Sequence, residues 1–593
     1  MEFTSAGSGS LDSTLHLTSE LESLRETAPV SPYGLIARAR TDLERLRVVL
    51  ESYGYYQSAV RISIDGQDIS DITLGDRLAA LPQNTDARVA VSFTLGPLYH
   101  LGQIEFDGAV PAVALKALGL APGQPAVADD VLTGGARLLT ALQNQGYAFA
   151  KVDPPQAFEL PDSHELTLKF HVVTGAVTRI GQIEINGLKR MRLRRARSVM
   201  GLKTGELYSA AKVEQARRNL LDTGVFGTVD ATLGTQADES GRVPVTFTVS
   251  ERKRHAVSLN AAYSSDLGGS GGVTWSDRNF LGGGEQLKLS ASVININGDA
   301  TNGVGYDVGA LLTLPRFMRN TQSLQLSLTA INQSLQAYDQ TAETAAATLT
   351  RRFGSQWSAS VGLSATQESI HQPQEALLLG RDTFHYTMFA LPLGLNYDST
   401  ALPTPVADPT HGVRMGATVA PTLSLGPSNA TFIISQFHIS TYLDFDQLLG
   451  EDAGRTVLAL RGLGGFAQGA SDIDLPPDQR FYAGGSGTIR GYRFQSVGPE
   501  FADGTPVGGV SMDALSAELR QRFGLNYGAA VFIDAGQVGQ SARPFAGRLE
   551  LGAGTGLRYY TPIGPLRIDV ALPLHRTPAD DRFEIYIGLG QAF

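Results

Sequence analysis

Hydrophobic and polar positions alternate differently in the two halves of the chain. Up to about residue 254, some segments carry apolar residues at helical spacing and others carry them at every second position. The first predicted amphipathic helix has its apolar positions at Leu43, Leu46, Val49, Leu50 and Tyr53. Strands of period two are predicted at residues 89–95, 166–172 and 243–249. This pattern predicts small α+β units in the first half of the chain.

A sequence repeat organises these elements into three units. The segment 101–108 (LGQIEFDG) recurs at residues 180–187 (IGQIEING). Each unit has a predicted helix that ends at a glycine followed by apolar or aromatic residues, at Gly54, Gly146 and Gly224. Glycine suits this position because it adopts the left-handed conformation that commonly closes a helix. We therefore expect three α+β modules in this half.

From Arg254 onward, helical spacing disappears and apolar and polar residues alternate in strand-length segments. Residues 287–293 and 324–330 are two such segments, and turn-forming clusters such as residues 297–299 (NGD) separate them. The chain contains about sixteen of them, and tilted strands of this length cross a bilayer as closed barrels because hydrocarbon offers no partner to an open sheet edge. Residues 254–593 are therefore predicted to form a transmembrane antiparallel β-barrel.

A soluble all-β domain, such as a sandwich or a propeller, is the alternative, since alternation alone does not exclude it. Two features favour the barrel. The chain stops on Phe593, which closes an apolar face of the last strand, like the C-terminal strand by which outer-membrane proteins are recognised. The opposite faces of the late strands are ionic, as at Arg558, Arg567 and Asp569, and a water-filled lumen accommodates such a face better than a sandwich core.

Composition narrows the possible classes further. The net charge of −10 argues against a nucleic-acid partner, and the absence of cysteine excludes disulfides, thiolate metal sites and cysteine nucleophiles. No apolar run is long enough for a membrane-spanning helix. Residues 1–11 are rich in Gly and Ser and lack the pattern of a signal peptide, so we expect them to be a leader in front of a mature exported chain.

Several motifs of the second half resemble those of one family. Residues 484–492 (GGSGTIRGY) lie in a stretch of about 40 residues without strand alternation, longer than a simple connection. This motif resembles the Arg-Gly-Phe/Tyr loop of the superfamily of outer-membrane barrels that includes the BamA, TamA and two-partner-secretion transporter families, whose sixth extracellular loop folds into the lumen. Residues 279–284 (NFLGGG), 532–538 (FIDAGQV) and 556–569 resemble other motifs of the same superfamily. A Pro-Thr-Arg-Gly element is matched with His411 in place of Arg, and we assign it no role.

The resemblance implies an architecture. The repeated modules resemble POTRA domains, the periplasmic units of this superfamily, with expected boundaries at residues 12–97, 98–176 and 177–253. Three POTRA domains before a barrel are most similar to the TamA family, because BamA members have more modules and two-partner-secretion pores have fewer. The expected location is the bacterial outer membrane, with the modules in the periplasm.

The resemblance also implies a function. The expected activity is assembly and insertion of outer-membrane proteins, notably autotransporters, through a seam between the first and last barrel strands. The expected partners are an inner-membrane-anchored periplasmic protein of the TamB type, unfolded outer-membrane clients and outer-membrane lipid. The alternatives are a general insertase of the BamA kind and a two-partner-secretion pore that exports a soluble protein through its lumen.

Site residues follow from the motifs and from strand parity. The resemblance nominates Arg490, Gly491 and Tyr492 as the lumen-loop motif. Because neighbouring apolar residues face lipid, parity turns Glu518 and Asp534 inward, where we expect one or both of them to anchor the guanidinium of Arg490. The seam and the C-terminal signal are assigned to Gly588, Gly590 and Phe593. The two glycines weaken the seam in this interpretation; tolerance of curvature at barrel closure is the alternative.

Two further features bear on chemistry. No nucleophile elbow, zinc-binding helix, phosphate loop or dinucleotide loop is present, so we expect neither an enzyme nor a cofactor or metal. The basic run at residues 189–197 (KRMRLRRAR) lies early in the third module. It is expected to be either a solvated helix face or a surface for anionic lipid or a partner.

Overall fold

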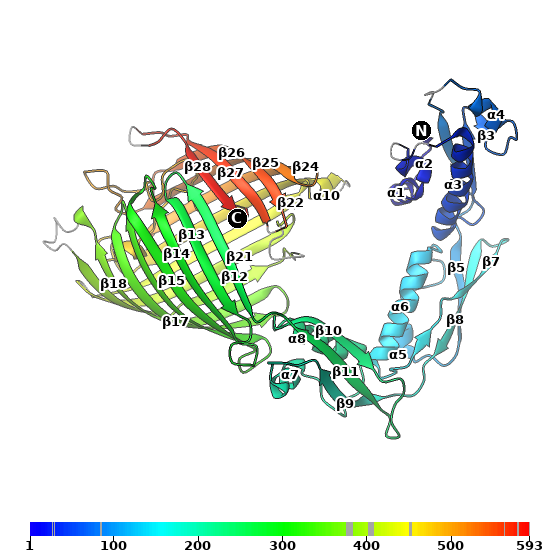
Figure 1. Ribbon diagram of the computed structural model, residues 1–593, viewed down its shortest axis with the longest axis horizontal. Helices are drawn as coiled ribbons and strands as arrows, with labels where there is room; N and C mark the ends of the chain where they lie inside the picture. Colours follow the sequence, from blue (N-terminus) through cyan, green and yellow to red (C-terminus); the bar gives the residue numbers. More distant parts are fainter. Residues whose placement is uncertain are drawn as a thin grey trace. The chain divides into compact units, whose positions relative to one another are not determined.

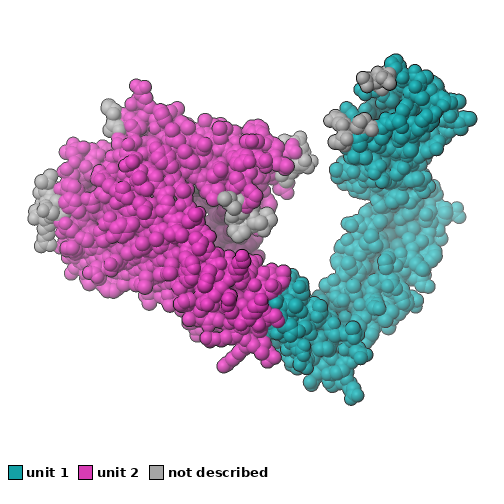
Figure 2. Space-filling model, viewed as in Figure 1, with its two compact units in different colours: residues 1–186, 200–219, 229–249 teal, residues 187–199, 220–228, 250–593 magenta. Residues whose placement is uncertain are grey.

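The computed structural model groups the chain into two compact units (Figure 2). The first comprises residues 1–186, 200–219 and 229–249, and the second comprises residues 187–199, 220–228 and 250–593. The structure describes residues 1–25, 28, 30–82, 86–374, 383–400, 402, 408–427, 429–449, 454–562, 564–577 and 580–591. No helix within these residues is both long enough and apolar enough to cross a membrane.

The first module is a four-stranded sheet with its helices packed on it (Figure 1). The strand order is β1-β4-β2-β3, with bounds β1 (Glu2–Phe3), β2 (Ala59–Ile64), β3 (Gln67–Asp68) and β4 (Val89–Thr94). The helices are α1 (Gly9–Thr18), α2 (Glu20–Ser23), α3 (Pro32–Ser52) and α4 (Leu74–Ala79). The stretch expected to be a leader contributes β1 and the buried Leu11 to this module.

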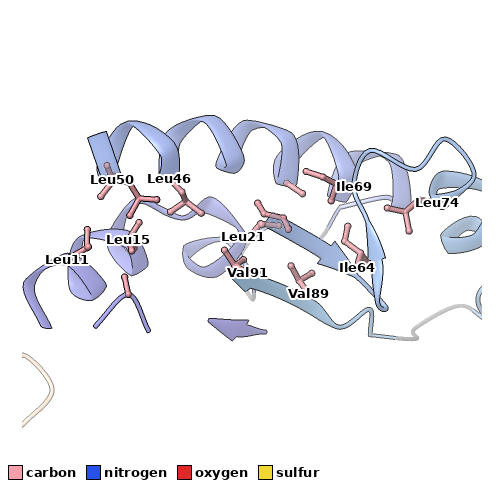
Figure 3. Close-up of a cluster of buried hydrophobic side chains, with 14 of the residues drawn as sticks. Leu11, Leu15, Leu21, Leu46, Leu50, Ile64, Ile69, Leu74, Val89 and Val91 are labelled. Carbon is pink, nitrogen blue, oxygen red and sulfur yellow. The ribbon is translucent and has the colours of Figure 1, made fainter. Parts of the chain in front are cut away.

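Local sequence explains the long helix of this module. Ser31 caps α3 by accepting a hydrogen bond from the Gly34 N–H, and Pro32 occupies the first turn, where its missing N–H is not needed. Gly54 follows the helix with φ of 94°. The helix buries its apolar face against the strands, and Figure 3 shows Leu46 and Leu50 facing Leu11, Leu15 and Val91.

The second and third modules repeat this plan. The second has the strand order β5-β8-β6, with β7 also paired to β8; its elements are β5 (His100–Asp107), α5 (Ala112–Leu115), α6 (Ala128–Asn144), β6 (Lys151–Val152), β7 (Gln156–Leu160) and β8 (Glu165–Val173). The third has the order β10-β11-β9, with β9 (Arg179–Asn186), α7 (Leu193–Met200), α8 (Ala210–Leu221), β10 (Phe226–Leu233) and β11 (Arg242–Glu251). The repeated segments are the strands β5 and β9, and each pairs in parallel with a later strand of its own module.

The remaining strands close into one antiparallel barrel. Their bounds are β12 (His255–Ser264), β13 (Gly268–Asp277), β14 (Gln286–Ile296), β15 (Thr301–Pro315), β16 (Gln322–Leu335), β17 (Asp339–Phe353), β18 (Trp357–His371), β19 (Phe384–Ala390), β20 (Leu393–Asp398), β21 (Gly412–Leu425), β22 (Ala430–Asp444), β23 (Thr456–Gln468), β24 (Ser511–Phe523), β25 (Tyr527–Gly539), β26 (Glu550–Thr561), β27 (Gly564–Pro573) and β28 (Glu584–Leu589). A short helix, α10 (Phe445–Leu449), follows β22.

The barrel has sixteen strands, because β19 and β20 are two parts of one strand. Both pair with β18 on one side and with β21 on the other. Pro392 separates them, since it has no N–H to donate to the ladder. The prediction of a transmembrane barrel of about sixteen antiparallel strands is therefore confirmed.

Side chains alternate between the two faces of the barrel wall. Apolar residues such as Leu328, Leu515 and Ile533 are exposed on the outside, where a bilayer covers them. Residues of opposite parity, such as Glu518 and Asp534, are buried inside. The alternation that defined the strands in the sequence thus separates a lipid face from a lumen face.

Candidate functional site: the lumen loop and the strand seam

A long loop, residues 469–510, connects β23 to β24 and is packed inside the barrel. It has its own backbone hydrogen bonds, which join Phe481 to Gly509 and Ala483 to Val497. It includes a single 3-10 turn, η1 (Pro477–Gln479). Backbone groups of the loop are thus satisfied partly within the loop and partly by the barrel wall, which allows it to remain folded away from bulk solvent. The motif Arg490-Gly491-Tyr492 lies within it.

Arg490 is held by two carboxylates of the barrel wall. Its side chain is 1% exposed. The Nε and Nη2 atoms donate to the two oxygens of Asp534 on β25 at 2.8 and 3.1 Å, and Nη1 donates to Glu518 on β24 at 2.7 Å. The Arg490 backbone N–H also donates to Asp534, at 3.1 Å. This bidentate arrangement on one carboxylate and single bond on a second matches the planar donor fork of a guanidinium.

The surroundings keep the guanidinium charged. Burial on its own lowers the pKa of Arg490, but the ion pairs with Asp534 and Glu518 outweigh that effect, so this pKa lies above its ordinary value. The guanidinium carbon also lies 3.4 Å from the ring centroid of Phe532, as in a cation–π contact. A cation is therefore fixed at the junction of the loop with β24 and β25.

Further charged side chains extend the site along the wall. Arg520 on β24 donates to Glu518 at 2.9 Å, and Arg558 on β26 forms an ion pair with Asp569 on β27. Asp569 also lies 3.8 Å from Arg490. These charges are taken out of water and compensate one another, so removing one member leaves a buried charge without one of its partners.

Glycines allow the loop backbone to touch the wall. Gly491 has φ of 99°, and a Cβ added there would lie 2.6 Å from the carbonyl carbon of Leu572 on β27. A Cβ at Gly552 on β26 would lie 1.9 Å from the carbonyl oxygen of Arg490. The Gly491 N–H donates to the hydroxyl of Tyr586 on β28 at 3.2 Å. Side chains at either glycine would push the loop away from the last strands.

Tyr492 completes the contact with the wall. Its hydroxyl donates to Glu550 on β26 at 3.0 Å and accepts from the N–H of His575 at 3.3 Å. Burial and the hydrogen bond to Glu550 raise the pKa of Tyr492 to about 12, so the phenol remains a donor at neutral pH. Three consecutive loop residues thus contact each of the five C-terminal strands, β24 to β28.

The seam between the first and last strands is short. Among the described residues, β12 pairs with β28 only at Tyr263 opposite Ile587 and Ser264 opposite Tyr586. Ser265 extends this contact by one backbone bond to Ile585 and by a side-chain bond to Glu584. By contrast, β12 pairs with β13 along its whole length. Residues 255–262 therefore have no described partner strand on the seam side, and within the described part of the chain this edge offers its backbone groups for pairing.

The assigned seam residues lie beyond this paired part. Gly588 is in β28 after the last residue paired with β12, and an added Cβ would come no closer than 3.5 Å to Arg567. Gly590 has φ of 95° and nothing within 4 Å of a built Cβ. Its N–H donates to the Pro565 carbonyl at 2.7 Å. Phe593 lies outside the described residues.

Strand parity in the sequence also carries a signal for further members of the site. Arg520 has the parity of Glu518, and Arg558 and Asp569 face the lumen from neighbouring strands. Tyr586 and Glu550 also face inward, but nothing local indicates that the loop reaches them. Their roles depend on how deeply the loop enters the barrel, which alternation does not encode.

Comparison with protein families agrees with this geometry. Residues 279–593 match the model described as the Omp85 superfamily domain. The chain belongs to the Omp85 superfamily. Residues 178–252 match a second model, named POTRA and described as a surface antigen variable number repeat. This Omp85 protein is thus an outer-membrane barrel with a periplasmic POTRA domain, and it is not an enzyme.

Individual relatives carry the BamA name. The chain is similar to the outer membrane protein assembly factor BamA of Neisseria meningitidis, with 21% identity over 92% of this chain and 72% of that protein. The same factor from Nitratidesulfovibrio vulgaris is 25% identical over 82% of this chain and 61% of its own length. BamA of Neorickettsia risticii is 26% identical over 42% of this chain and 31% of its own length.

Solved structures show the same fold. BamA from Haemophilus ducreyi lacking POTRA domains 1–3 has a TM-score of 0.66 at 21% identity, covering 83% of this chain and all of that one. CdiB from Acinetobacter baumannii has a TM-score of 0.51 at 16% identity, covering 83% of this chain and 90% of that one. At these identities the likeness concerns the fold alone.

Proposed function

We propose that this Omp85 protein assembles and inserts outer-membrane proteins by offering the open edge of β12 to incoming strands. The observation that carries the proposal is the seam, which closes at Tyr263, Ser264 and Ser265 and leaves residues 255–262 without a described partner on that side. Val257 and Leu259 on this stretch are 64% and 82% exposed. The edge is a ready template for another strand.

The physical need for such a template is clear. A strand that enters hydrocarbon alone leaves its N–H and C=O groups unsatisfied, at several kcal/mol for each group. Pairing with β12 first would satisfy one edge of the client strand, and later client strands would add to the first. No energy source is required, because the client folds on its own free energy.

The lumen loop has a complementary role in this proposal. By bracing β24 to β28 through Arg490, Gly491 and Tyr492, it keeps one side of the seam rigid. The contacts named here for Arg490, Gly491 and Tyr492 are all with β24 to β28, so in this proposal opening takes place on the β12 side. The anchoring carboxylates Glu518 and Asp534 belong to this brace.

The choice of client and partner is the finer part of the proposal. The relatives named BamA support a role in outer-membrane protein assembly. The three α+β modules, assigned to residues 12–97, 98–176 and 177–253 as POTRA domains, favour the TamA family over other branches. We therefore infer autotransporters as preferred clients and an inner-membrane-anchored protein of the TamB type as partner, with POTRA sheet edges binding extended segments.

A reversible seam lock tests the mechanism. The chain has no native cysteine, so a double variant, Tyr263→Cys with Ile587→Cys, places a disulfide between two residues that face each other across the seam. The matched control, Ile568→Cys with Ile587→Cys, uses the same β28 residue but bridges to β27, which must stay paired in either state. Both proteins are reconstituted in lipid vesicles and assayed for membrane assembly of an autotransporter barrel.

We expect the oxidised seam lock to stop assembly, reduction to restore it, and the control to remain active throughout. Full activity of the oxidised seam lock would refute insertion through this seam. If the lock instead leaves export of a soluble passenger intact while lumen blockage stops it, the protein is a two-partner-secretion type pore. Equal assembly of autotransporters and of other barrels would favour a general insertase of the BamA kind.

A further inference from the structure

A segment before the barrel is attached to the turns at one barrel end. In residues 187–199, which belong to the second compact unit, the Arg192 N–H donates to Gly282 at 2.9 Å. The Arg195 side chain donates to the carbonyls of Gly283 and Pro315 at 3.1 and 2.8 Å. These carbonyls lie in the β13–β14 turn and at the end of β15. The segment is thus fixed to the end of the barrel where the chain enters from the modules, which is the periplasmic end.

Several exposed arginines lie on the attached segment and on the neighbouring turns of the barrel. We define the basic rim as six arginines that are exposed on the attached segment, on the β15–β16 turn and at the end of β17: Arg192, Arg194, Arg197, Arg319, Arg351 and Arg352. Like charges gathered in this way repel one another unless an anion lies between them.

The carboxylates nearby are engaged elsewhere and do not neutralise the rim. Glu251 accepts from the backbone N–H groups of residues 189–191 at 2.9 to 3.0 Å. Asp277 forms an ion pair with Arg254, and Glu285 accepts from the Gly283 N–H. Asp222 is exposed but lies 3.9 Å from Arg316. These acids therefore satisfy local groups, and the six arginines of the rim are exposed. Arg351 shares the outward face of Phe353 on β17, whereas Arg352 has the parity of the lumen face and lies at its mouth.

Apolar side chains are interspersed with the cations. Leu193, between two arginines of the rim, is 45% exposed, and Met318 beside Arg319 is 85% exposed. Leu281 at the tip of the β13–β14 turn is half exposed. At the end of β17, Phe353 is opposite Trp357 of β18, and both rings are exposed. The rim is continuous with the lipid-facing wall, and basic residues mixed with aromatic and aliphatic ones are typical of a membrane interface.

We propose that the basic rim binds the anionic headgroups of phospholipids in the periplasmic leaflet, along the barrel end that runs from the β13–β14 turn to β17. Continuity with the hydrocarbon belt places lipid phosphates next to these guanidinium groups, whose planar donor fork fits a phosphate in bidentate geometry. Each basic residue near such a surface favours an anionic lipid by about 1 kcal/mol, or about fivefold in local enrichment. The rim gathers anionic lipid along this part of the barrel end, and it holds the attached segment against the membrane.

The two tryptophans of the chain make this measurable. Trp275 and Trp357 both lie near the periplasmic end of the barrel, on β13 and β18. The full-length protein is reconstituted in vesicles that contain brominated phosphatidylglycerol or, at the same mole fraction, phosphatidylcholine with the same brominated chains. Quenching of tryptophan fluorescence then reports which lipid lies beside the rim. The variants Trp275→Phe and Trp357→Phe separate the two positions.

We expect brominated phosphatidylglycerol to quench several-fold more effectively than brominated phosphatidylcholine, and high salt to remove the difference in the unmodified protein. Changing Arg192, Arg194, Arg197, Arg319, Arg351 and Arg352 to Gln should bring the two quenching curves together. A matched control changes three exposed cations of the second module, Lys116, Lys151 and Lys169, to Gln and should keep the preference.

Retention of a heat-modifiable barrel band on SDS gels shows that each variant is folded. Equal quenching by the two lipids in the unmodified protein would overturn the proposal. So would a preference that survives both high salt and the removal of all six arginines. Loss of the preference in the lysine control would mean that net charge, and not the rim, selects the lipid.

Discussion

Replacing Arg490 by Ala is expected to destabilise the barrel strongly. The change removes three side-chain hydrogen bonds to Asp534 and Glu518 and leaves both carboxylates buried, each with an exposed fraction of 0%. Breaking a buried ion pair from one side costs about 3–5 kcal/mol. Glu518 keeps Arg520 at 2.9 Å, so most of the cost is expected from Asp534. An equilibrium constant for unfolding should therefore rise by about a hundredfold or more.

Further variants divide the loss of unfolding free energy in Arg490→Ala between the guanidinium and its carboxylate partners. Arg490→Lys keeps the charge but not the bidentate fork and should recover only part of the loss. Adding Asp534→Asn to Arg490→Ala removes the buried carboxylate charge that has lost Arg490. This double variant should recover more of the lost unfolding free energy than Arg490→Lys, because the two residues are coupled. The assay is reversible urea unfolding in lipid vesicles, followed by tryptophan fluorescence and by heat-modifiable migration on SDS gels.

Arg493→Ala is the matched control in the same loop. Arg493 is partly exposed and forms an ion pair with Asp581 at 3.3 Å, and an exposed pair contributes about 1 kcal/mol or less. Equal unfolding free energies for the Arg490 and Arg493 variants would refute the view that the loop is clamped by buried charge. A stable Arg490→Ala barrel that fails in client assembly would show that the clamp serves function alone.

Three further changes have definite expected outcomes. Gly491→Ala should lower the free energy of unfolding in urea by about 1–3 kcal/mol, because φ is 99° and a Cβ would lie 2.6 Å from the carbonyl carbon of Leu572. Gly590→Ala, which has open space around the added Cβ, should cost less. Equal losses for the two variants would contradict the close approach of Gly491 to the wall. Burial raises the pKa of Glu251, but the three backbone hydrogen bonds that it accepts outweigh this effect, so the pKa is lowered. The stability that ionised Glu251 gives to the folded protein is therefore fully present above the pKa of the unfolded state and is lost as pH falls through the pKa of the folded state. Limited proteolysis of residues 187–199 should therefore accelerate at acidic pH in the unmodified protein, and Glu251→Gln should show a faster rate with little pH dependence. Leu589→Asp puts a charge on an exposed position of β28 and should lower the amount of folded barrel recovered in the membrane fraction; unchanged recovery would mean that this face does not contact lipid.

Alternation along the chain was sufficient to define the barrel wall. Because side chains alternate strictly in a strand, apolar Leu515 and Ile533 imply that Glu518 and Asp534 face the lumen, and the structure places both carboxylates there. The glycines Gly54, Gly146 and Gly224 likewise indicated the helix ends, and all three have positive φ. These features depend on local geometry, which a sequence expresses directly.

Other features depend on closure of the whole barrel. The contacts of Tyr492 with Glu550 and of Gly491 with Tyr586 require a loop that enters the lumen to a particular depth. The short pairing of β12 with β28 depends on the register of every neighbouring pair among the sixteen strands. No short segment of the sequence specifies all of these registers. The attachment of Arg195 to Gly283 and Pro315 similarly joins residues far apart in the chain. The sequence by itself determined which faces the strands present, whereas only the tertiary structure decided which faces meet, because registers and loop depths are set by non-local packing.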